Sequence, residues 1–347
     1  MKYLRFTLMP GLILLFIIVV YYKNEYLFPL IVFVNVLIIC GDYFLPRDNK
    51  IRKYPFKGLF DLILFIHLPI MIILLVIISI RSIHIINPYE IIGIIFLTGL
   101  FLGSGSTVVA HELVHRTKNK FSLWVGNWLL ALSWDNAFSI EHVYGHHKNI
   151  GYDIDPATAK RGQSIYSFLL SSTFNQMRNA YNIELSRVSR QNLWWVQNRF
   201  ILGLFRNLFI LMAIFFIGGG NAVFIYCPSI IWAKILLETV NYIEHYGLVR
   251  VEGRPVRPRH SWNSNHMISG TLLYYLTRHS AHHEKASLKF YDLEPYPDAP
   301  ALRYGYLSMI YLALGTPSIY RLIMDKQLKE WDCNYASKNE QLIISKA

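Results

Sequence analysis

The stretch from residue 91 to residue 116 reads IIGIIFLTGLFLGSGSTVVAHELVHR, and it decides the fold class. Residues 91–110 carry no charge, and about 20 apolar residues are enough for a helix to cross a bilayer. The last six residues contain His111 and His115, which are four positions apart and therefore share one face of a helix. The stretch predicts a membrane-spanning helix that presents two imidazole rings where it leaves the lipid.

The rest of the chain has the composition of a membrane protein. Of its 347 residues, 53% are hydrophobic and 16% are charged, whereas a soluble globular protein carries about 25% charge. Six stretches are long and apolar enough to span a bilayer, namely residues 6–22, 26–45, 62–80, 91–110, 200–218 and 222–242. We therefore expect an all-α fold, a bundle of six transmembrane helices.

Basic residues indicate which side of the membrane each loop occupies. Residues 46–58 hold a cluster of lysines and arginines, and such loops usually lie in the cytoplasm. Counting spans from this loop places residues 111–199 and 248–347 on the same side, where we expect a helical cap. Residues 121–140 are too short to span securely, so they predict a buried or interfacial helix of this cap. Because no linker or repeat separates the parts, we expect a single domain over 1–347.

Charge and cysteine content exclude several other classes of protein. The formal net charge is +12, but no nucleic-acid-binding motif accompanies it, so we expect no nucleic-acid partner. The cysteines, Cys40, Cys227 and Cys333, are far apart and form no CxxC pair. This spacing provides neither a disulfide framework nor a thiolate metal site.

Nine of the thirteen histidines fall into four short clusters. In a helix, residues three or four positions apart share a face, so His111 should pair with His115, His142 with His146, and His279 with both His282 and His283. Six imidazoles complete the octahedron of one ion, so nine indicate two metal ions. The candidate ligands are His111 and His115 in HELVHR, His142, His146 and His147 in EHVYGHH, His245 in NYIEHYG, and His279, His282 and His283 in RHSAHH.

Carboxylates accompany these clusters. A metal-bound histidine usually donates its second ring N–H to a carboxylate or a carbonyl, which fixes the tautomer. Glu112, Glu141 and Glu244 adjoin three clusters, and Asp155 follows the second cluster after Asp153. We expect Glu112, Glu141, Asp155 and Glu244 to orient the ligands, the alternative being that they are ordinary cap or surface acids.

These motifs resemble those of the membrane-bound alkane monooxygenase family. The resemblance rests on HELVHR, EHVYGHH, NYIEHYG and RHSAHH in this order, and on the region from HSWNSNH at residue 260 to YPDAPALRYGY ending at residue 306. It extends from about residue 41 to residue 326. One departure is Arg116, where the family commonly has lysine, and the charge is kept.

The resemblance implies a specific activity. It implies a six-span protein with two non-haem iron ions held by the nine histidines, which hydroxylates the terminal carbon of an alkane with dioxygen to give a primary alcohol. It also implies a bacterial inner membrane location, a cytoplasmic active site, and electrons from rubredoxin, itself reduced by an NAD(P)H-dependent reductase. Because the chain has no CxxC pair, we expect rubredoxin to be a separate protein.

The chemistry of an alkane agrees with this reading. An alkane offers no polar group, so selectivity must come from an apolar channel, and the substrate can enter from the bilayer. Attack on its inert C–H bond requires a redox-active metal, which favours iron over zinc.

Three other functions fit parts of the pattern. A membrane fatty-acyl desaturase or another lipid hydroxylase would use similar histidine clusters. An intramembrane zinc protease would use HELVH with Glu112 as the general base, although that leaves seven clustered histidines unexplained. A metal transporter would need ionisable residues along a path through the membrane, where Lys234 and Glu238 are the candidates, but their spacing favours an ion pair.

Overall fold

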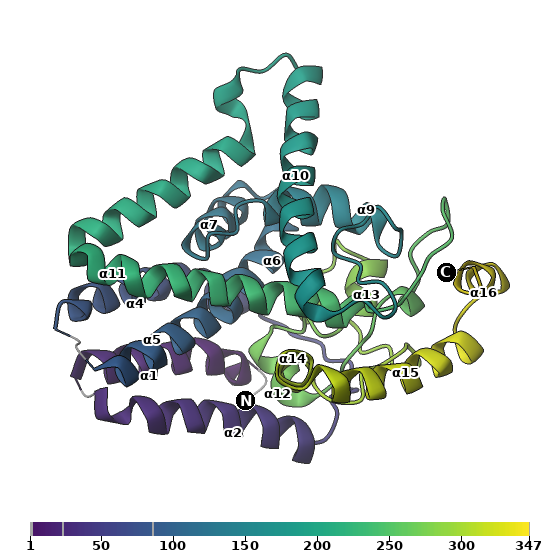
Figure 1. Ribbon diagram of the computed structural model, residues 1–347, viewed down its shortest axis with the longest axis horizontal. Coiled ribbons are helices and arrows are strands. Elements are labelled where there is room, and N and C mark those ends of the chain that lie inside the picture. The colour runs from purple at the N-terminus through teal and green to yellow at the C-terminus, as the bar shows by residue number, and fades with distance from the viewer. Residues whose placement is uncertain (1–2, 23, 85–86, 347) are drawn as a thin grey trace. The chain divides into compact units, whose positions relative to one another are not determined.

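The protein is helical throughout the described residues. A computed structural model describes residues 3–22, 24–84 and 87–346, which form helices joined by loops (Figure 1). In these ranges the extended backbone pairs only as an isolated bridge between Asn263 and Ala301. The all-α class expected from the sequence is therefore confirmed for the described residues.

The chain folds into two compact units, each assembled from segments that are distant in sequence. The first unit consists of Met1–Leu37, Tyr54–Ile140 and Tyr181–Leu237. The second unit consists of Ile38–Lys53, Glu141–Ala180 and Glu238–Ala347. The expectation of a single domain stays a prediction.

Several helices are long and apolar enough to cross a membrane. In the described residues there are five, namely Leu4–Tyr22, Leu27–Phe44, Gly58–Ser82, Pro88–Val114 and Arg199–His245. The first four include α1 (Leu8–Tyr22), α2 (Leu27–Phe44), α3 (Gly58–Phe65) with α4 (His67–Ser82), and α5 (Pro88–Phe101) with α6 (Val108–Val114). They correspond to the first four predicted spans.

The last two predicted spans lie on one helix, α11 (Arg199–His245), which is 47 residues long. Its backbone breaks at Gly219, with φ 64° and ψ −156°, a conformation that is essentially restricted to glycine. Figure 1 shows the two arms of α11 meeting at a sharp bend. Residues 200–218 form the first arm and residues 222–242 belong to the second. Five apolar helices are therefore observed, and the number of six membrane crossings stays a prediction.

In the first unit, the helical segment that leads to His111 is tightly packed. Pro88 opens α5, and the Asn87 side chain accepts a hydrogen bond from the Tyr89 N–H at 3.0 Å, as expected of a helix N-cap. A buried π-helical segment, Leu102–Thr107, then joins α5 to α6. A Cβ atom on Gly105 in this segment would lie 2.7 Å from Cδ1 of Ile13, so glycine permits the close approach of α1.

The predicted helix over residues 121–140 is two helices, α7 (Lys120–Leu132) and α8 (Phe138–Glu141). A turn separates them, in which Trp134 has a φ of 60°. Gly126 of α7 allows close contact with α6, because a Cβ atom there would lie 3.0 Å from Val114. The location of these helices in a cytoplasmic cap stays a prediction.

Two charged residues of α11, Lys234 and Glu238, have partners on neighbouring segments. Lys234 Nζ lies 3.1 Å from the Asp135 carboxylate, in the turn between α7 and α8. Glu238 accepts hydrogen bonds from Ser172 at 2.6 Å and Gln176 at 2.7 Å. These contacts tie α11 to its neighbours, as structural ion pairs and hydrogen bonds do, and the pair predicted between Lys234 and Glu238 stays a prediction.

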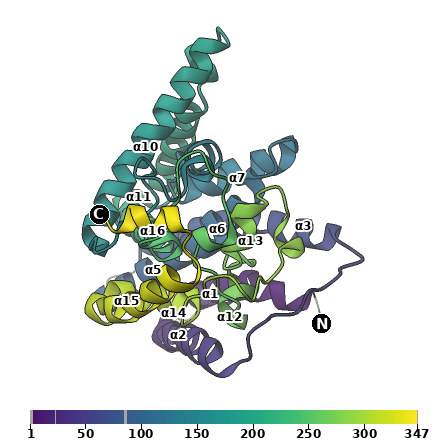
Figure 2. The same cartoon turned by 90° about the vertical axis from the view of Figure 1, so that its right-hand side faces the viewer.

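The second unit consists of shorter helices and ordered loops. Figure 2 shows its C-terminal part in green to yellow. Its helices are α9 (His147–Asn149), most of α10 (Ile165–Arg190), α12 (Met267–Leu272), α13 (His279–Glu284), α14 (Tyr306–Gly315), α15 (Pro317–Asn334) and α16 (Lys338–Ile344).

Two arginines, of which Arg278 is buried, fix the segments of the second unit that carry histidines. Arg278, just before α13, lies over the Tyr275 ring with 3.8 Å between its Cζ atom and the ring centroid. Its guanidinium donates to the carbonyl of Asp48 at 2.9 Å and to that of Leu293 at 2.6 Å. Arg161 donates to the Gly247 carbonyl at 2.9 Å, just after α11. Such charge-assisted hydrogen bonds hold loops rigidly without regular secondary structure.

Candidate metal centre

Short helical segments carry the nine clustered histidines. Two of these histidines belong to the first compact unit and seven to the second. The positions are His111 on α6 and His115 just after it, His142 and His146 on the π-helical segment His142–His146, His147 at the start of α9, His245 at the end of α11, and His279, His282 and His283 on α13.

Four of the seven histidines form what we call the buried quartet: His146, His245, His279 and His283. Their ligand nitrogens all lie within 4.8 Å of one another. The Nε2 atom of His279 is 3.0 Å from that of His245 and 2.8 Å from that of His283, whose Nε2 is 3.3 Å from that of His146. All four residues are buried. Converging imidazole nitrogens of this kind are the donor set of a transition-metal ion.

The electrostatics of His283, one member of the quartet, favour a neutral ring. Burial lowers the pKa of His283 well below its ordinary value, and the neighbouring imidazoles, that of His279 first, lower it further. A metal ligand must be a neutral imidazole with a free lone pair. His283 is therefore in the protonation state that a metal ion requires.

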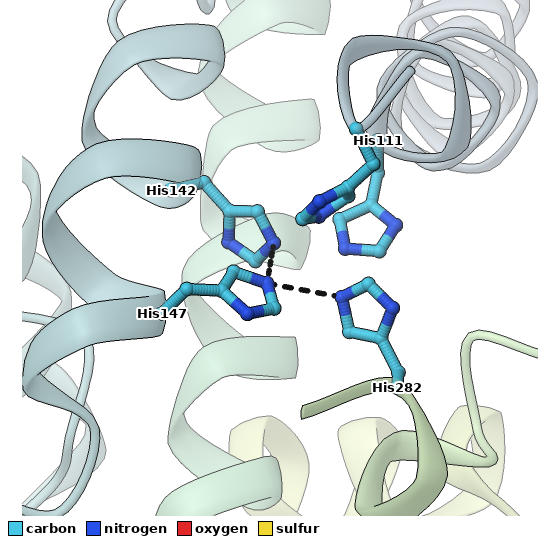
Figure 3. A group of neighbouring side chains, drawn as sticks. His111, His142, His147 and His282 are labelled. Atoms are coloured by element: carbon cyan, nitrogen blue, oxygen red, sulfur yellow. Dashed lines mark hydrogen bonds between the residues drawn. The ribbon is translucent and has the colours of Figure 1, made fainter. Parts of the chain in front are cut away.

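The other three histidines of the second unit form the histidine trio: His142, His147 and His282. The Nε2 atom of His147 lies 3.1 Å from that of His142 and 3.1 Å from that of His282 (Figure 3). The rings of His142 and His282 are stacked, with centroids 6.1 Å apart and planes at 13°. The trio is a second group of convergent donors, and the expectation of two metal ions stays a prediction.

The grouping of His142 corrects a prediction. The sequence indicated a pair with His146, four residues on, but the Nε2 atom of His142 contacts that of His147, five residues on, while His146 belongs to the quartet. The reason is that this segment is π-helical, with hydrogen bonds between residues five positions apart. The rings of His142 and His146 are still neighbours, with centroids 5.3 Å apart, but they belong to different groups.

Helix α13 contributes to both groups. The predicted pairing of His279 with His283 is confirmed, since both belong to the quartet. His282 lies between them in sequence and joins the trio instead. One turn of helix therefore supplies imidazoles to two groups, because its side chains diverge around the helix axis.

His111 and His115 form a pair in the first unit. Their ring centroids are 4.9 Å apart, and their ligand nitrogens lie within 4.8 Å of each other. The predicted pairing across one turn of helix is confirmed. Their role as metal ligands stays a prediction.

Two of the four predicted carboxylates contact histidines of the quartet. Asp155 Oδ2 lies 2.9 Å from Nδ1 of His146 and also accepts a hydrogen bond from the Thr158 hydroxyl at 2.6 Å. Burial alone would lower the pKa of His146, but the Asp155 carboxylate raises it. A proton at Nδ1 leaves the Nε2 lone pair facing the quartet. Glu244 Oε2 lies 3.2 Å from Nε2 of His279, so it contacts the inward nitrogen of that ring.

The other two carboxylates have other partners. Glu141 is buried and accepts a hydrogen bond from the Asn179 amide at 3.1 Å. Burial first, and the nearby Asp155 carboxylate second, raise its pKa to about 7. Glu112 Oε1 pairs with the Arg116 guanidinium at 2.9 Å, and Arg116 also pairs with Asp61 at 2.7 Å. The structure thus gives Arg116, the departure from the family pattern, two carboxylate partners.

The sequence did not predict the partner of His245. Its Nδ1 atom lies 3.3 Å from the main-chain carbonyl oxygen of His260. A backbone carbonyl can hold a ligand tautomer as well as a carboxylate can. Because any residue has a carbonyl, no side-chain pattern could have indicated this contact.

The donor set fits iron as well as other imidazole-binding metals. Imidazole nitrogens suit zinc, copper, iron and nickel, and the second unit offers seven of them together with carboxylates. The three cysteines are free. The donors of both groups are therefore nitrogens, and a thiolate centre is not indicated.

Apolar helices of membrane-spanning length and buried groups of convergent imidazoles together define an integral-membrane protein of the histidine-cluster type. The family model described as Fatty acid desaturase matches residues 89–313, a range that contains all nine clustered histidines. The chain therefore belongs to the alkane monooxygenase and fatty acid desaturase-like superfamily. This finding confirms the resemblance seen in the sequence.

Several characterised relatives are hydroxylases. Alkane 1-monooxygenase 2 of Pseudomonas aeruginosa is 35% identical over 268 residues, which cover 72% of this chain and 67% of the relative. Alkane 1-monooxygenase 1 of Alcanivorax borkumensis is 35% identical over 68% of this chain and 58% of the relative. The xylene/toluene monooxygenase hydroxylase component XylM of Pseudomonas putida is 31% identical over 86% of this chain and 82% of the relative. The chain spans 58–61% of the length of three of the alkane 1-monooxygenases that it matches.

Proposed function

We propose that this protein hydroxylates the terminal methyl group of alkanes, with dioxygen as oxidant, at a centre of two iron ions held by its nine clustered histidines. The observation that carries the proposal is the convergence of seven imidazoles of the second unit into a buried quartet and a trio. Sequence similarity to alkane 1-monooxygenases supports the reaction type. An oxidation of this kind inserts one oxygen atom into the C–H bond and reduces the other to water.

The ligands divide between the two ions by simple counting. The quartet supplies four nitrogens for one ion. The trio supplies three for the other, and an octahedral ion has room for the two nitrogens of His111 and His115. We therefore assign all nine histidines as ligands.

The remaining side chains prepare these ligands. Bound iron supplies the redox chemistry that activates dioxygen, which zinc cannot do. Asp155 holds a proton at Nδ1 of His146, and the carbonyl of His260 does the same for His245. Burial of the quartet excludes bulk water and lowers the pKa of His283, which keeps that ring neutral. Burial raises the pKa of Glu141 and of Glu244, and two bound cations would favour release of those protons, so that the carboxylates offset part of the metal charge.

The electron donor follows from the same proposal. We assign a separate rubredoxin as donor, reduced by an NAD(P)H-dependent reductase, because the chain has no CxxC pair. The basic residues of the 46–58 loop support a cytoplasmic location of the cap in a bacterial inner membrane. A basic surface on that side would attract a small acidic carrier.

A second substrate class has support from one observation. The match to XylM covers more of this chain than the matches to the two alkane 1-monooxygenases described above. XylM is a component of a xylene/toluene monooxygenase. The second candidate is therefore hydroxylation of a methyl group on an aromatic ring. This reaction also breaks a methyl C–H bond, but in a wider substrate.

Product analysis distinguishes these substrates. Membranes that contain the protein receive rubredoxin, its reductase, NADH and dioxygen, with octane, hexadecane or toluene in parallel. We expect 1-alkanols, and no product from the His245→Ala variant inserted to the same level. Benzyl alcohol in the absence of alkanols would favour the aromatic substrate, and new double bonds in acyl lipids would favour a desaturase. Metal analysis should give two iron ions per chain, whereas one zinc ion per chain fits only a protease that uses Glu112.

A further inference from the structure

A contact network leads from the quartet to the C-terminal helix of the second unit. It begins at the turn Pro258–His260, whose last carbonyl oxygen lies 3.3 Å from Nδ1 of His245. A proton at Nδ1 leaves the lone pair of His245 on Nε2, the atom that faces His279 at 3.0 Å. The orientation of the His245 ring therefore depends on where this turn holds the carbonyl of His260.

The side chain of His260 is fixed at both ring nitrogens. Its Nδ1 accepts a hydrogen bond from the Arg257 N–H at 3.0 Å, so the ring proton must be on Nε2. Nε2 lies 2.8 Å from Oε1 of Glu340, to which it donates. The His260 residue is 1% exposed. Its ring can neither rotate nor exchange partners with water, so it transmits the position of Glu340 to the turn.

Glu340 holds the turn through a second residue as well. Its carboxylate accepts hydrogen bonds from Arg259 at 2.9 Å and 3.2 Å, and from the Ser337 N–H at 2.7 Å at the start of α16. The indole of Trp331, on α15, donates to the Arg259 carbonyl at 2.7 Å. Helices α15 and α16 thus hold Arg259, the residue before His260, whose carbonyl contacts His245.

The charges agree with this arrangement. Burial alone would raise the pKa of Glu340, but the hydrogen bonds from His260 and Arg259 lower it to about 2. Burial lowers the pKa of His260 in spite of the adjacent carboxylate. At neutral pH the pair is therefore a neutral imidazole that donates to a carboxylate, the arrangement that the Arg257 contact also requires.

We propose that Glu340 is a positioning residue for the metal ligand His245, acting through the His260 side chain and main-chain carbonyl. The inference rests on the proposed ligand role of His245. It goes beyond that role because Glu340 is 80 residues away from His260 in sequence and belongs to none of the histidine motifs. Loss of such a partner typically weakens metal binding about 10–100-fold.

The test compares variants of the full-length protein in detergent. Glu340→Ala removes every contact of the carboxylate, and Glu340→Gln keeps an acceptor of the same shape without the charge. Gln341→Ala is the matched control, since Gln341 donates to the Asp332 carbonyl at 2.8 Å and thereby ties α16 to α15. Metal affinity is measured by competition between the apoprotein and a chelator for Co²⁺, whose visible spectrum reports the ligand geometry.

We expect Glu340→Ala to weaken Co²⁺ binding at one of the two sites, the one that contains His245, about 10–100-fold. The visible spectrum of Co²⁺ at that site should change as well. Glu340→Gln should weaken the same site less, and Gln341→Ala should leave both sites unchanged. If Glu340→Ala and Glu340→Gln both fold and both keep the Co²⁺ affinity and the Co²⁺ spectrum of the unmodified protein, the inference is overturned. Unchanged Co²⁺ binding by His245→Ala would instead remove the ligand role of His245, so the two failures are distinguishable.

Discussion

Two aspartates that are two residues apart show how strongly surroundings decide the role of a side chain. Asp155 is buried against Nδ1 of His146, while the Asp153 carboxylate is 89% exposed and pairs with Lys160 at 3.1 Å. The sequence placed both near the site and selected Asp155 as the orienting residue. The structure shows the contact that this role needs, because a buried carboxylate loses its water and must find a fixed donor, and the role itself stays a prediction.

This pair gives a matched prediction at the scale of one residue. Asp155→Asn should weaken metal binding about 10–100-fold, because the amide no longer favours a proton at Nδ1 of His146. Asp153→Asn should change it little, because an exposed ion pair contributes about 0–1 kcal/mol. Chelator competition and product rate measure both variants. Equal effects of the two substitutions would mean that the loop as a whole, rather than the contact with His146, supports the centre.

At the scale of helices, the sequence predicted where helices form better than how they are wound. Apolar stretches predicted the long helices. The favourable free energy of placing about 20 apolar residues in lipid outweighs the local conformational preference of each residue. The π-helical segments could not be predicted, because one extra residue in a turn leaves no mark in an apolar or histidine pattern. That single residue decides that His142 faces His147, and so it separates the quartet from the trio. The contact between His260 and Glu340 was equally hidden, since 80 residues separate them.

The break in α11 yields a prediction for one element. A side chain at Gly219 would meet no atom within 4 Å, so its cost comes only from the backbone conformation. Gly219→Ala should destabilise the protein by about 1–3 kcal/mol or straighten the bend, because φ 64° with ψ −156° is essentially restricted to glycine. The neighbouring Gly220→Ala is the control, with the same open space and no left-handed φ. Thermal unfolding in detergent measures both, and equal stability of the two variants would show that the bend is not needed.

At the scale of the whole molecule, the histidines divide unequally between the two compact units. The first unit carries the apolar helices α1 and α4 together with the pair His111 and His115 on α6. The second unit carries six of the other seven histidines on short helical segments and the seventh, His245, at the end of α11. Segments of this kind gain little from helix propensity alone, so a bound ion should contribute a large share of their stability.

Removal of the metal should therefore act on selected segments. A ligand at 100 times its Kd stabilises the folded state by about 2.7 kcal/mol, and this contribution is felt where the ligands lie. Hydrogen exchange of the metal-loaded and chelator-treated protein should show lost protection in residues 141–150, in residues 278–284 and in α6. Helices α1 and α4 should keep theirs. His245→Ala should show a smaller change, because only the ion assigned to the trio and to His111 and His115 remains for the chelator to remove. If α6 stays protected while the other two segments open, His111 and His115 are not ligands, and if α1 and α4 open equally, the metal stabilises the fold as a whole.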